Sequence, residues 1–193
     1  MPPRRAVAIP AGSRGGKPSA PRAFDDRTFR TALGRFATGV IVVTAGPRRA
    51  PHAMTANAFL SGSLAPPLVV VSVGRKARMH ERLAGARRFG VSILGQAQEP
   101  ASRHFAGQAV PGFAPAFGEL AGVPVLAHAA VALTVRIEHR YGCGDHTLFV
   151  GEVEDLAVNE AAPPLLYYEG RYGTLHAFPE TQGRSPEPYP SFF

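Results

Sequence analysis

The sequence predicts a single, mainly β domain with short helices, folded as a closed or nearly closed antiparallel barrel. Several short β-branched runs are bounded by turn residues, two or three segments have helical spacing, and no internal repeat is present. The 193 residues, 45% hydrophobic and 18% charged, suffice for one domain with a sizeable core. A parallel doubly wound sheet is less favoured because the helices are few and short.

The first half of the domain is predicted to mix helices and strands. The segment "DDRTFRTALGRFATG" has apolar residues at helical spacing, with Gly39 just past the predicted helix end. "VIVVTAG" and "HAMTANAF" are predicted to form a hairpin around the turn "PRRAP". "PPLVVVSVG" is predicted as a strand buried on both faces, and "RKARMHERLAGARR" as a short helix with Met79 and Leu83 facing inward.

The second half is predicted to be more regular. "FGVSIL" is a strand, "AQEPASRHFAG" a short helix, and "QAVPGFAPAFGELAGVPVL" an irregular segment rich in Gly and Pro. "VALTVRIEHRY" alternates apolar and polar residues, so we expect a half-buried strand that pairs with "HTLFVGEVEDLAV". A loop from Gly142 to Asp145 would place Tyr141 opposite His146. "PLLYYEG" and "RYGTLHAF" are predicted as terminal strands or a short hairpin.

Charge and composition divide the chain into three parts. Residues 1–24 are predicted to be a disordered basic tail, residues 25–177 the folded domain, and residues 178–193 a Pro-rich tail. The first tail holds five basic residues and no acidic one, which leaves 16 basic and 14 acidic residues elsewhere out of a net charge of +7. The folded part therefore lacks a strong basic bias, and no nucleic-acid partner is expected.

Membrane and disulfide signals are missing from the sequence. No apolar run approaches the roughly 18 residues of a membrane span, and the single cysteine cannot form an internal disulfide. We therefore expect a cytoplasmic protein with no membrane partner.

The stretch "HRYGCGDHTLF" gathers His139, Cys143, Asp145 and His146 within eight residues. A zinc site is disfavoured because the chain has no second Cys or His pair at ligand spacing, so no metal is predicted. A thiol nucleophile is disfavoured because Cys143 lies between glycines in a turn, with no helix N-terminus to lower its pKa. For His146, a structural turn histidine and a functional histidine are about equally favoured by the residues alone.

Five segments occur in order between residues 29 and 175: "GRFATGVIVVT", "AMTANAFLSGSLAPPLVVVSVG", "FGVSIL", "GDHTLFVGEVE" and "PLLYYEGRYGTL". Together they resemble the flavin reductase family, whose fold is the FMN-binding split β-barrel. The resemblance implies a homodimeric NAD(P)H:flavin oxidoreductase that binds FMN or FAD and uses NADH or NADPH. Many relatives supply diffusible reduced flavin to a separate monooxygenase, so the resemblance also implies such a partner.

Two other functions stay open at this point. One is a reductase that holds its flavin tightly and acts on a dedicated substrate. The other is a non-catalytic flavin-binding redox protein, since a fold does not determine a function.

The resemblance assigns the flavin ring to "TANAFLSGS", where small side chains let a flat ring approach the backbone and polar groups meet its edge. The candidates in this segment are Thr55, Ala56, Asn57, Ala58, Ser61 and Ser63. The flavin phosphate is assigned to Arg75, Lys76 and Arg78 beside a helix start. Relatives usually carry hydroxyl side chains where this chain has Ala77 and Met79, and a solvated basic face is the alternative.

His146, in "GDH", is the predicted catalytic residue and is also expected to contact the cofactors. Its expected role is to orient and polarise, because hydride passes directly from nicotinamide to flavin. Phe105, in "SRHFAG", is expected near the nucleotide pocket, with a place in the core as the alternative. Arg171 and Tyr172, in "YYEGRYG", are expected to close the rim of the pocket.

Overall fold

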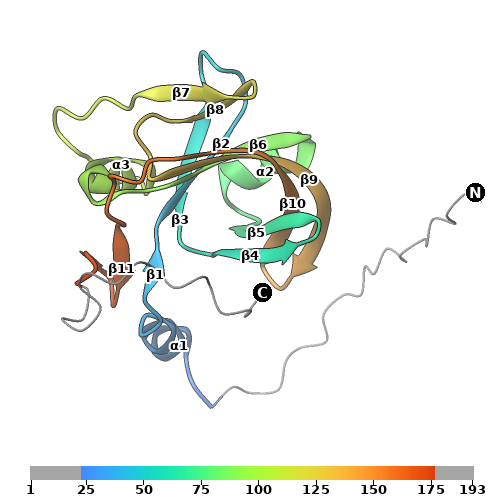
Figure 1. Cartoon of the computed structure of the whole chain (residues 1–193). Coiled ribbons are helices and arrows are strands. Elements are labelled where there is room, and N and C mark those ends of the chain that lie inside the picture. Colours follow the sequence, from blue (N-terminus) through green and yellow to red (C-terminus); the bar gives the residue numbers. More distant parts are fainter. Residues whose placement is uncertain (1–22, 177–193) are drawn as a thin grey trace, which may run out of the picture.

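A computed structural model describes residues 23–176, so most of the predicted N-terminal tail and all of the predicted C-terminal tail lie outside the described residues. The main sheet contains β2 (Ile41–Ala45), β3 (His52–Ala56), β4 (Phe59–Leu64), β5 (Pro67–Gly74), β6 (Arg88–Ile93), β9 (Val131–Cys143) and β10 (His146–Val158). Its antiparallel order is β3-β2-β6-β9-β10-β5-β4, coiled into a barrel that does not close (Figure 1). The predicted fold class is confirmed.

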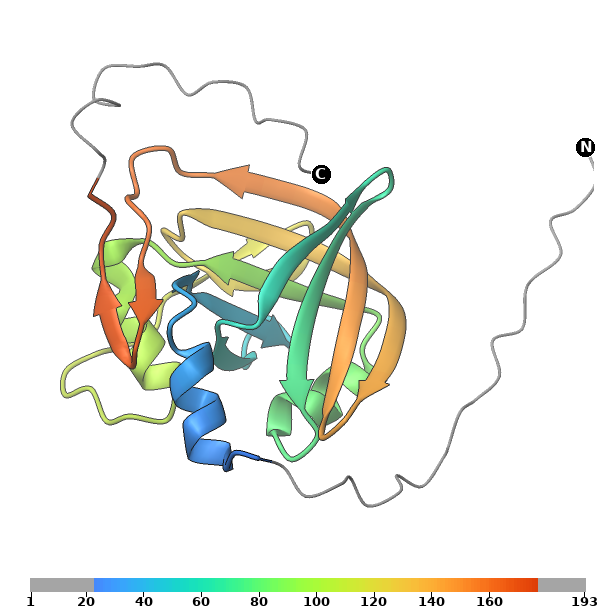
Figure 2. The ribbon, with the colours of Figure 1, turned by 90° about the horizontal axis from the view of Figure 1, so that it is seen from below.

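Smaller elements surround the barrel. β1 (Thr38–Gly39), β11 (Leu166–Tyr168) and β12 (Arg171–Gly173) form a second sheet, and β7 (Phe117–Leu120) pairs with β8 (Val123–Leu126). The helices are α1 (Asp26–Leu33), α2 (Arg78–Gly85) and α3 (Glu99–Phe105), and the 3₁₀-turn η1 (Gln96–Gln98) precedes α3. Figure 2 shows α1 beside the β11–β12 hairpin, where Arg35 pairs with Glu169 at 2.7 Å.

The main core fills the interior of the coiled sheet. Phe89 from β6 and Phe149 from β10 are fully buried, and α2 contributes Met79 and Leu83, which are also fully buried. The predicted inward orientation of these two α2 residues is confirmed. Burial of large apolar side chains is the main favourable term in folding, so α2 is held by the core rather than by its own eight residues.

A second core lies on the other side of β2. Val40 and Val42 pack there with Leu94, Ala101 of α3 and Leu165, which precedes β11. Because β2 is buried along its whole length, it separates the two cores and fixes α3 and the β11–β12 hairpin against the barrel. These packed elements form the walls of the candidate site.

Helix α1 is shorter than predicted. The Asp25 side chain caps its start by accepting a hydrogen bond from Thr28 N–H at 2.7 Å. The helix ends at Leu33, with Gly34 as its cap, rather than near Gly39. The predicted boundary was wrong because Gly39 already belongs to β1, whose pairing with β11 extends the backbone from Thr38.

The strand β4 was missed, and the burial of β5 was predicted wrongly. β4 has the sequence "FLSGSL", with Ser61, Gly62 and Ser63 at its centre, and a register irregularity between Ser61 and Ser63 interrupts its pairing with β5. In β5 only Val69, Val71 and Val73 are buried, because its other face is partly exposed. A β-branched run was therefore a correct sign of a strand but not of burial on both faces.

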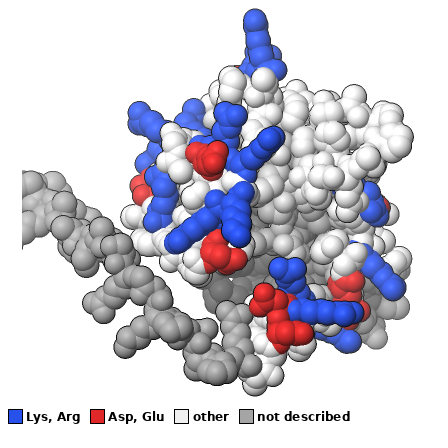
Figure 3. Space-filling view, turned by 180° about the vertical axis from the view of Figure 1, so that it is seen from behind, with Lys and Arg blue, Asp and Glu red and all other residues white. Residues whose placement is uncertain are grey.

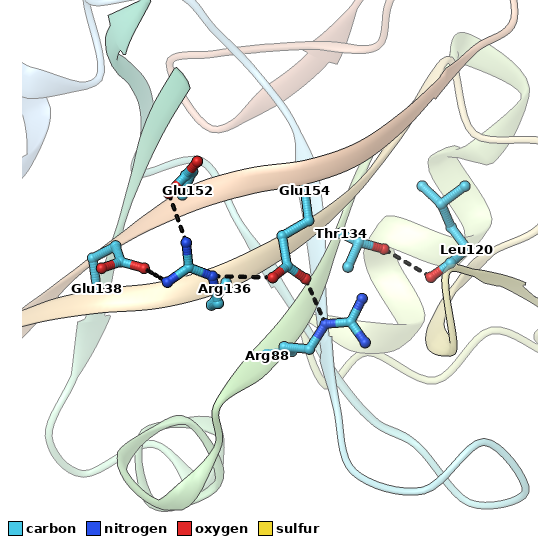
Figure 4. Close-up of polar contacts among 7 residues, drawn as sticks. All are labelled: Arg88, Leu120, Thr134, Arg136, Glu138, Glu152 and Glu154. Atoms are coloured by element: carbon cyan, nitrogen blue, oxygen red, sulfur yellow. Dashed lines mark hydrogen bonds and ion pairs between the residues drawn. The ribbon is translucent and has the colours of Figure 1, made fainter. Parts of the chain in front are cut away.

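The predicted irregular segment contains the β7–β8 hairpin. Its turn residues Ala121 and Gly122 both have positive φ, at 45° and 78°, as a two-residue type I′ turn requires. The hydroxyl of Thr134 on β9 donates to the carbonyl of Leu120 at 2.8 Å (Figure 4), which holds this hairpin over the barrel. An alanine in this turn position concealed the hairpin from the sequence pattern.

The β9–β10 hairpin has a tighter turn than predicted. Cys143 pairs with His146, so the turn consists of Gly144 and Asp145, and Gly144 has a φ of +59°. Tyr141 lies opposite Leu148 and not opposite His146. The predicted register was wrong because the polar residues "GCGD" include two strand residues.

A charged network stabilises the outer face of β6, β9 and β10 (Figure 4). Arg88 and Arg136 lie opposite each other in the β6–β9 pair, an unfavourable placement of like charges. Glu154 of β10 bridges them, at 2.7 Å from Arg88 Nε and 3.0 Å from Arg136 Nε. Arg136 also binds Glu152 at 2.7 Å and contacts Glu138, so carboxylates offset both cations.

Gly90 is a position where the barrel tolerates no side chain. A Cβ there would collide with the carbonyl oxygen of Pro124 and the hydroxyl of Thr44. We expect Gly90→Ala to lower the free energy of unfolding by about 1–3 kcal/mol through overpacking, measured by denaturant titration. Gly85→Ala is the matched control, because nothing lies within 4 Å of a Cβ at Gly85. Equal stability of the two variants would contradict the packing described.

Candidate functional site

A large groove lies between α1, the β9–β10 turn and the β11–β12 hairpin. Its volume is about 920 Å³, within the range of roughly 300–1,000 Å³ that is usual for ligand sites. Its lining includes the apolar side chains Phe29, Leu33 and Phe36 and the polar side chains Asp26, Arg30, Asn57, Asp145 and His146. The groove therefore combines apolar surface with polar groups, which suits a flat ring with a polar edge.

A smaller cavity of about 190 Å³ lies between β3, α3 and the β11–β12 hairpin. Its polar side chains come from Thr55, Asn57, Ser102, Gln108 and Tyr172. Asn57 and Tyr167 line both this cavity and the groove. The groove and the smaller cavity therefore adjoin each other, and Asn57 lines both.

Asn57 lies in the connection between β3 and β4, the two edge strands of the barrel. Its carbonyl accepts from Phe59 N–H at 3.0 Å, and Thr55 is fixed because its hydroxyl donates to the carbonyl of Ser102 at 2.7 Å. Within residues 23–176 the Asn57 amide makes no hydrogen bond, so its donors and acceptor can serve a ligand.

His146 is held at the start of β10 with its ring against Gly74. A Cβ built on Gly74 would lie 3.6 Å from Nε2, and Nδ1 is 2.8 Å from Oδ1 of Asp145. This hydrogen bond is the main cause that lowers the pKa of Asp145. The His146 side chain is 46% exposed, so a ligand in the groove can reach it.

The basic residues around the start of α2, Arg75, Lys76 and Arg78, lie near two different parts of the chain. Arg75 N–H donates to the carbonyl of Asp145 at 2.9 Å, and the charge of Lys76 contributes to the lowered pKa of Asp145, so both lie close to the β9–β10 turn. Arg78 lies instead near His52: burial lowers the pKa of His52, and the charges of Arg82 and Arg78 lower it further. Figure 3 shows that many Lys and Arg side chains gather at the upper left of the face seen from behind.

A family model described as "Flavin reductase like domain" matches residues 33–176. The chain belongs to this flavin reductase family. It is 44% identical over 150 residues to an NADH-dependent flavin reductase of Rhodococcus sp, which covers 76% of this chain and 85% of that protein. Over 147 residues it is 42% identical to the reductase component of 4-hydroxyphenylacetate 3-monooxygenase of Thermus thermophilus, covering 76% and 95% of the two chains.

A solved structure agrees with this assignment. The NADH:FAD oxidoreductase SgcE6 of Streptomyces globisporus, in complex with NAD and FAD fragments, has a TM-score of 0.71 and 42% identity. The match covers 78% of this chain and 93% of the other. The predicted family and its split-barrel fold are therefore confirmed.

The described residues of this flavin reductase fit a flavin. The groove offers apolar surface, a free amide at Asn57 and a half-exposed imidazole at His146. Thr38, opposite Tyr167 in the β1–β11 pair, has a buried hydroxyl oxygen with no partner among residues 23–176.

Several predicted site residues of the reductase lie together, and others do not. Thr55, Ala56, Asn57 and Tyr172 line the smaller cavity, and Asn57 and His146 line the groove. Neither space is lined by the remaining predicted residues, Ala58, Ser61, Ser63, Arg75, Lys76, Arg78, Phe105 and Arg171. Among residues 23–176, no three His, Cys, Asp or Glu side chains lie close enough to hold a metal ion.

The positions of these other residues have clear physical causes. Ser61 and Ser63 follow the edge strand β4 away from Asn57, with Ser61 exposed and Ser63 half-buried. Phe105 packs in the second core, 5.9 Å from Phe117 between ring centroids. Arg171 is exposed at the β11–β12 turn, opposite Tyr168.

Tyr172 is fixed more firmly than the sequence suggests. Its hydroxyl lies 2.8 Å from Oγ of the buried Ser102, and the Arg103 guanidinium lies 4.8 Å from its ring centroid. Ser102, Gln108 and Tyr167 were missed as cavity residues, because only the packing of α3 against β11 and β12 brings them together. The two adjacent tyrosines in "YYEGRYG" are the sequence feature that could have indicated Tyr167 as a cavity residue.

The groove wall on α1 was also missed. Its apolar spacing predicted an amphipathic helix, and none of the α1 residues Asp26–Leu33 is buried. Phe29 is 46% exposed, Leu33 58% and Phe36 77%. The helix therefore presents its apolar side to the groove and to solvent.

Proposed function

We propose that this flavin reductase is an NAD(P)H:flavin oxidoreductase that reduces FMN or FAD in the groove between α1 and the β9–β10 turn. The observation that carries the proposal is that Asn57 and His146 line one groove together with the apolar residues Phe29 and Leu33 of α1. Among the two nicotinamides, NADH is favoured because the Rhodococcus relative is NADH-dependent and SgcE6 is an NADH:FAD oxidoreductase.

When bound, the flavin supplies the electron-accepting ring that takes hydride directly from the nicotinamide. The residues of the chain then bind and orient the two molecules. The free amide of Asn57 meets the polar edge of the flavin, and His146 contacts the nicotinamide side of the groove. Arg75 and Lys76, beside the β9–β10 turn, supply positive charge for a phosphate.

The proposal includes a partner monooxygenase that receives reduced flavin. The Thermus relative, 42% identical, is the reductase component of such an enzyme pair. The groove is also compatible with release, because the His146 side chain is 46% exposed. An open site of this kind binds flavin as a substrate that enters and leaves.

Location is a further part of the proposal. None of the helices between residues 23 and 176 has the length and apolar character that crossing a membrane needs. We propose that the protein works in the cytoplasm, where its exposed free thiol, Cys143, would stay reduced.

We also propose a homodimer in which the second copy covers the apolar residues beside the groove. Leu33 at the end of α1 and Phe36 just after the helix are 58% and 77% exposed, and Leu60 and Leu64 of the edge strand β4 are 55% and 70% exposed. Exposed apolar patches and unpaired strand edges are features that an interface removes from water.

The activity is tested by steady-state oxidation of NADH and NADPH with FMN, FAD or riboflavin added in turn. We expect rapid oxidation only when a flavin is present, and faster turnover with NADH than with NADPH. Reduced flavin should leave the protein, so that cytochrome c, added as an electron acceptor, is reduced. An absence of nicotinamide oxidation with all three flavins would overturn the proposed function.

The dimer is tested by sedimentation velocity of the whole chain. We expect the wild type to sediment as a dimer and Leu33→Glu to shift it toward the monomer, because a charge at the interface is costly to desolvate. Thr31→Glu is the matched control on another side of α1, where Thr31 lies outside the groove. A monomeric wild type would rule out the interface proposed.

A further inference from the structure

Asp145 is bound to the one histidine that the groove contains among its described lining residues. The distance between Asp145 Oδ1 and His146 Nδ1 is 2.8 Å. A carboxylate can only accept a hydrogen bond, so Nδ1 must carry the hydrogen and donate it. The other nitrogen, Nε2, is then the atom left for a ligand, as an acceptor in the neutral ring or as a donor in the charged ring.

The backbone around this pair is fixed on both sides. His146 pairs with Cys143 on β9 and with Gly74 on β5, so its Cα cannot move without breaking the ladder. The carbonyl of Asp145 accepts from Arg75 N–H at 2.9 Å. Although the Asp145 side chain is 93% exposed, its short chain starts from a constrained turn and needs little further ordering to reach Nδ1.

The charges around the pair keep Asp145 ionised. The hydrogen bond from His146 lowers the pKa of Asp145, and the charges of His146 and Lys76 add to the effect. Arg75 lies on the same loop as Lys76, and Cys143 faces His146 across the ladder. From α1, Asp26 and Arg30 line the same groove. At neutral pH the carboxylate is therefore an acceptor for Nδ1–H and not a competing donor.

We propose that Asp145 is a positioning residue for hydride transfer, which holds the His146 ring in the tautomer with hydrogen on Nδ1, so that Nε2 is the nitrogen left for the bound nicotinamide or flavin. This inference rests on the proposed function and on the contact of His146 with the bound cofactors. Asp145 also lines the groove, but its Oδ1 is engaged with Nδ1 of His146, so the role proposed is one that it exerts through the histidine. The comparable arrangement in metal sites, a carboxylate that orients a histidine, is worth about 10–100-fold.

The decisive variant is Asp145→Asn. Asparagine has the same size as aspartate but carries an amide N–H. That N–H can donate to an unprotonated Nδ1, which favours the tautomer with the ring hydrogen on Nε2. We expect kcat/KM for NADH to fall by about tenfold, a magnitude typical of a lost histidine-orienting carboxylate, with the flavin dissociation constant unchanged. The pH profile of kcat/KM should also shift, and Asp145→Glu should restore part of the activity.

Two comparisons separate positioning from a general structural effect. In the background of His146→Ala, the Asp145→Asn substitution should cause no further loss. The matched control is Asp155→Asn on the same strand, where the exposed Asp155 carboxylate accepts only from Leu156 N–H among the described residues, at 2.8 Å. This control should leave activity and its pH profile unchanged.

The outcomes that overturn the inference are distinct from failure of the proposed function. Equal losses from Asp145→Asn in the wild-type and His146→Ala backgrounds, or an unchanged pH profile, would overturn it. Nitrogen NMR of labelled histidine tests the tautomer without any assay of activity, and hydrogen on Nε2 rather than Nδ1 in neutral wild-type His146 would also overturn it. A wild-type protein that does not oxidise NADH with added flavin would instead overturn the proposed function.

Discussion

The β9–β10 hairpin is the constraint on which the rest of the structure depends. Two strands of 13 residues pair along their length around a turn of two residues, and both continue the ladder to neighbouring strands. The barrel interior and the charged network both use this ladder, through Phe149 inside and Arg136 outside. Because the ladder fixes the register, it also fixes Asp145 and His146 at the groove.

The site lies where the barrel is not closed by hydrogen bonds. The edge strands β3 and β4 are joined through Asn57, which leaves a side chain at the gap that lines both cavities. The second core holds α3 and β11–β12 against one side of this gap, while α1 stands at the other with its apolar side uncovered.

The sequence predicted the fold class because alternation, turn residues and the inward residues Met79 and Leu83 all indicated the same barrel. It failed where a pattern depends on partners distant in the chain. The strand β4 and the Ala121–Gly122 turn are set by pairing with neighbours. The segment around Asn57 and the position of His146 could be predicted through motifs of the family, whereas Ser102 and Tyr167 meet only after α3 packs against β11. The exposed side of α1 looks in sequence like any core-facing helix.

The central claim, that flavin and nicotinamide meet in the groove walled by Asn57 and His146, is tested most directly by filling that space. Anaerobic stopped-flow reduction of added FMN and FAD by NADH should be slowed at least about tenfold by Asn57→Trp, as for other losses of substrate positioning. Val158→Trp, at a residue 60% exposed and outside both cavities, should leave the rate unchanged. An undiminished rate and unchanged flavin affinity in Asn57→Trp would contradict the account.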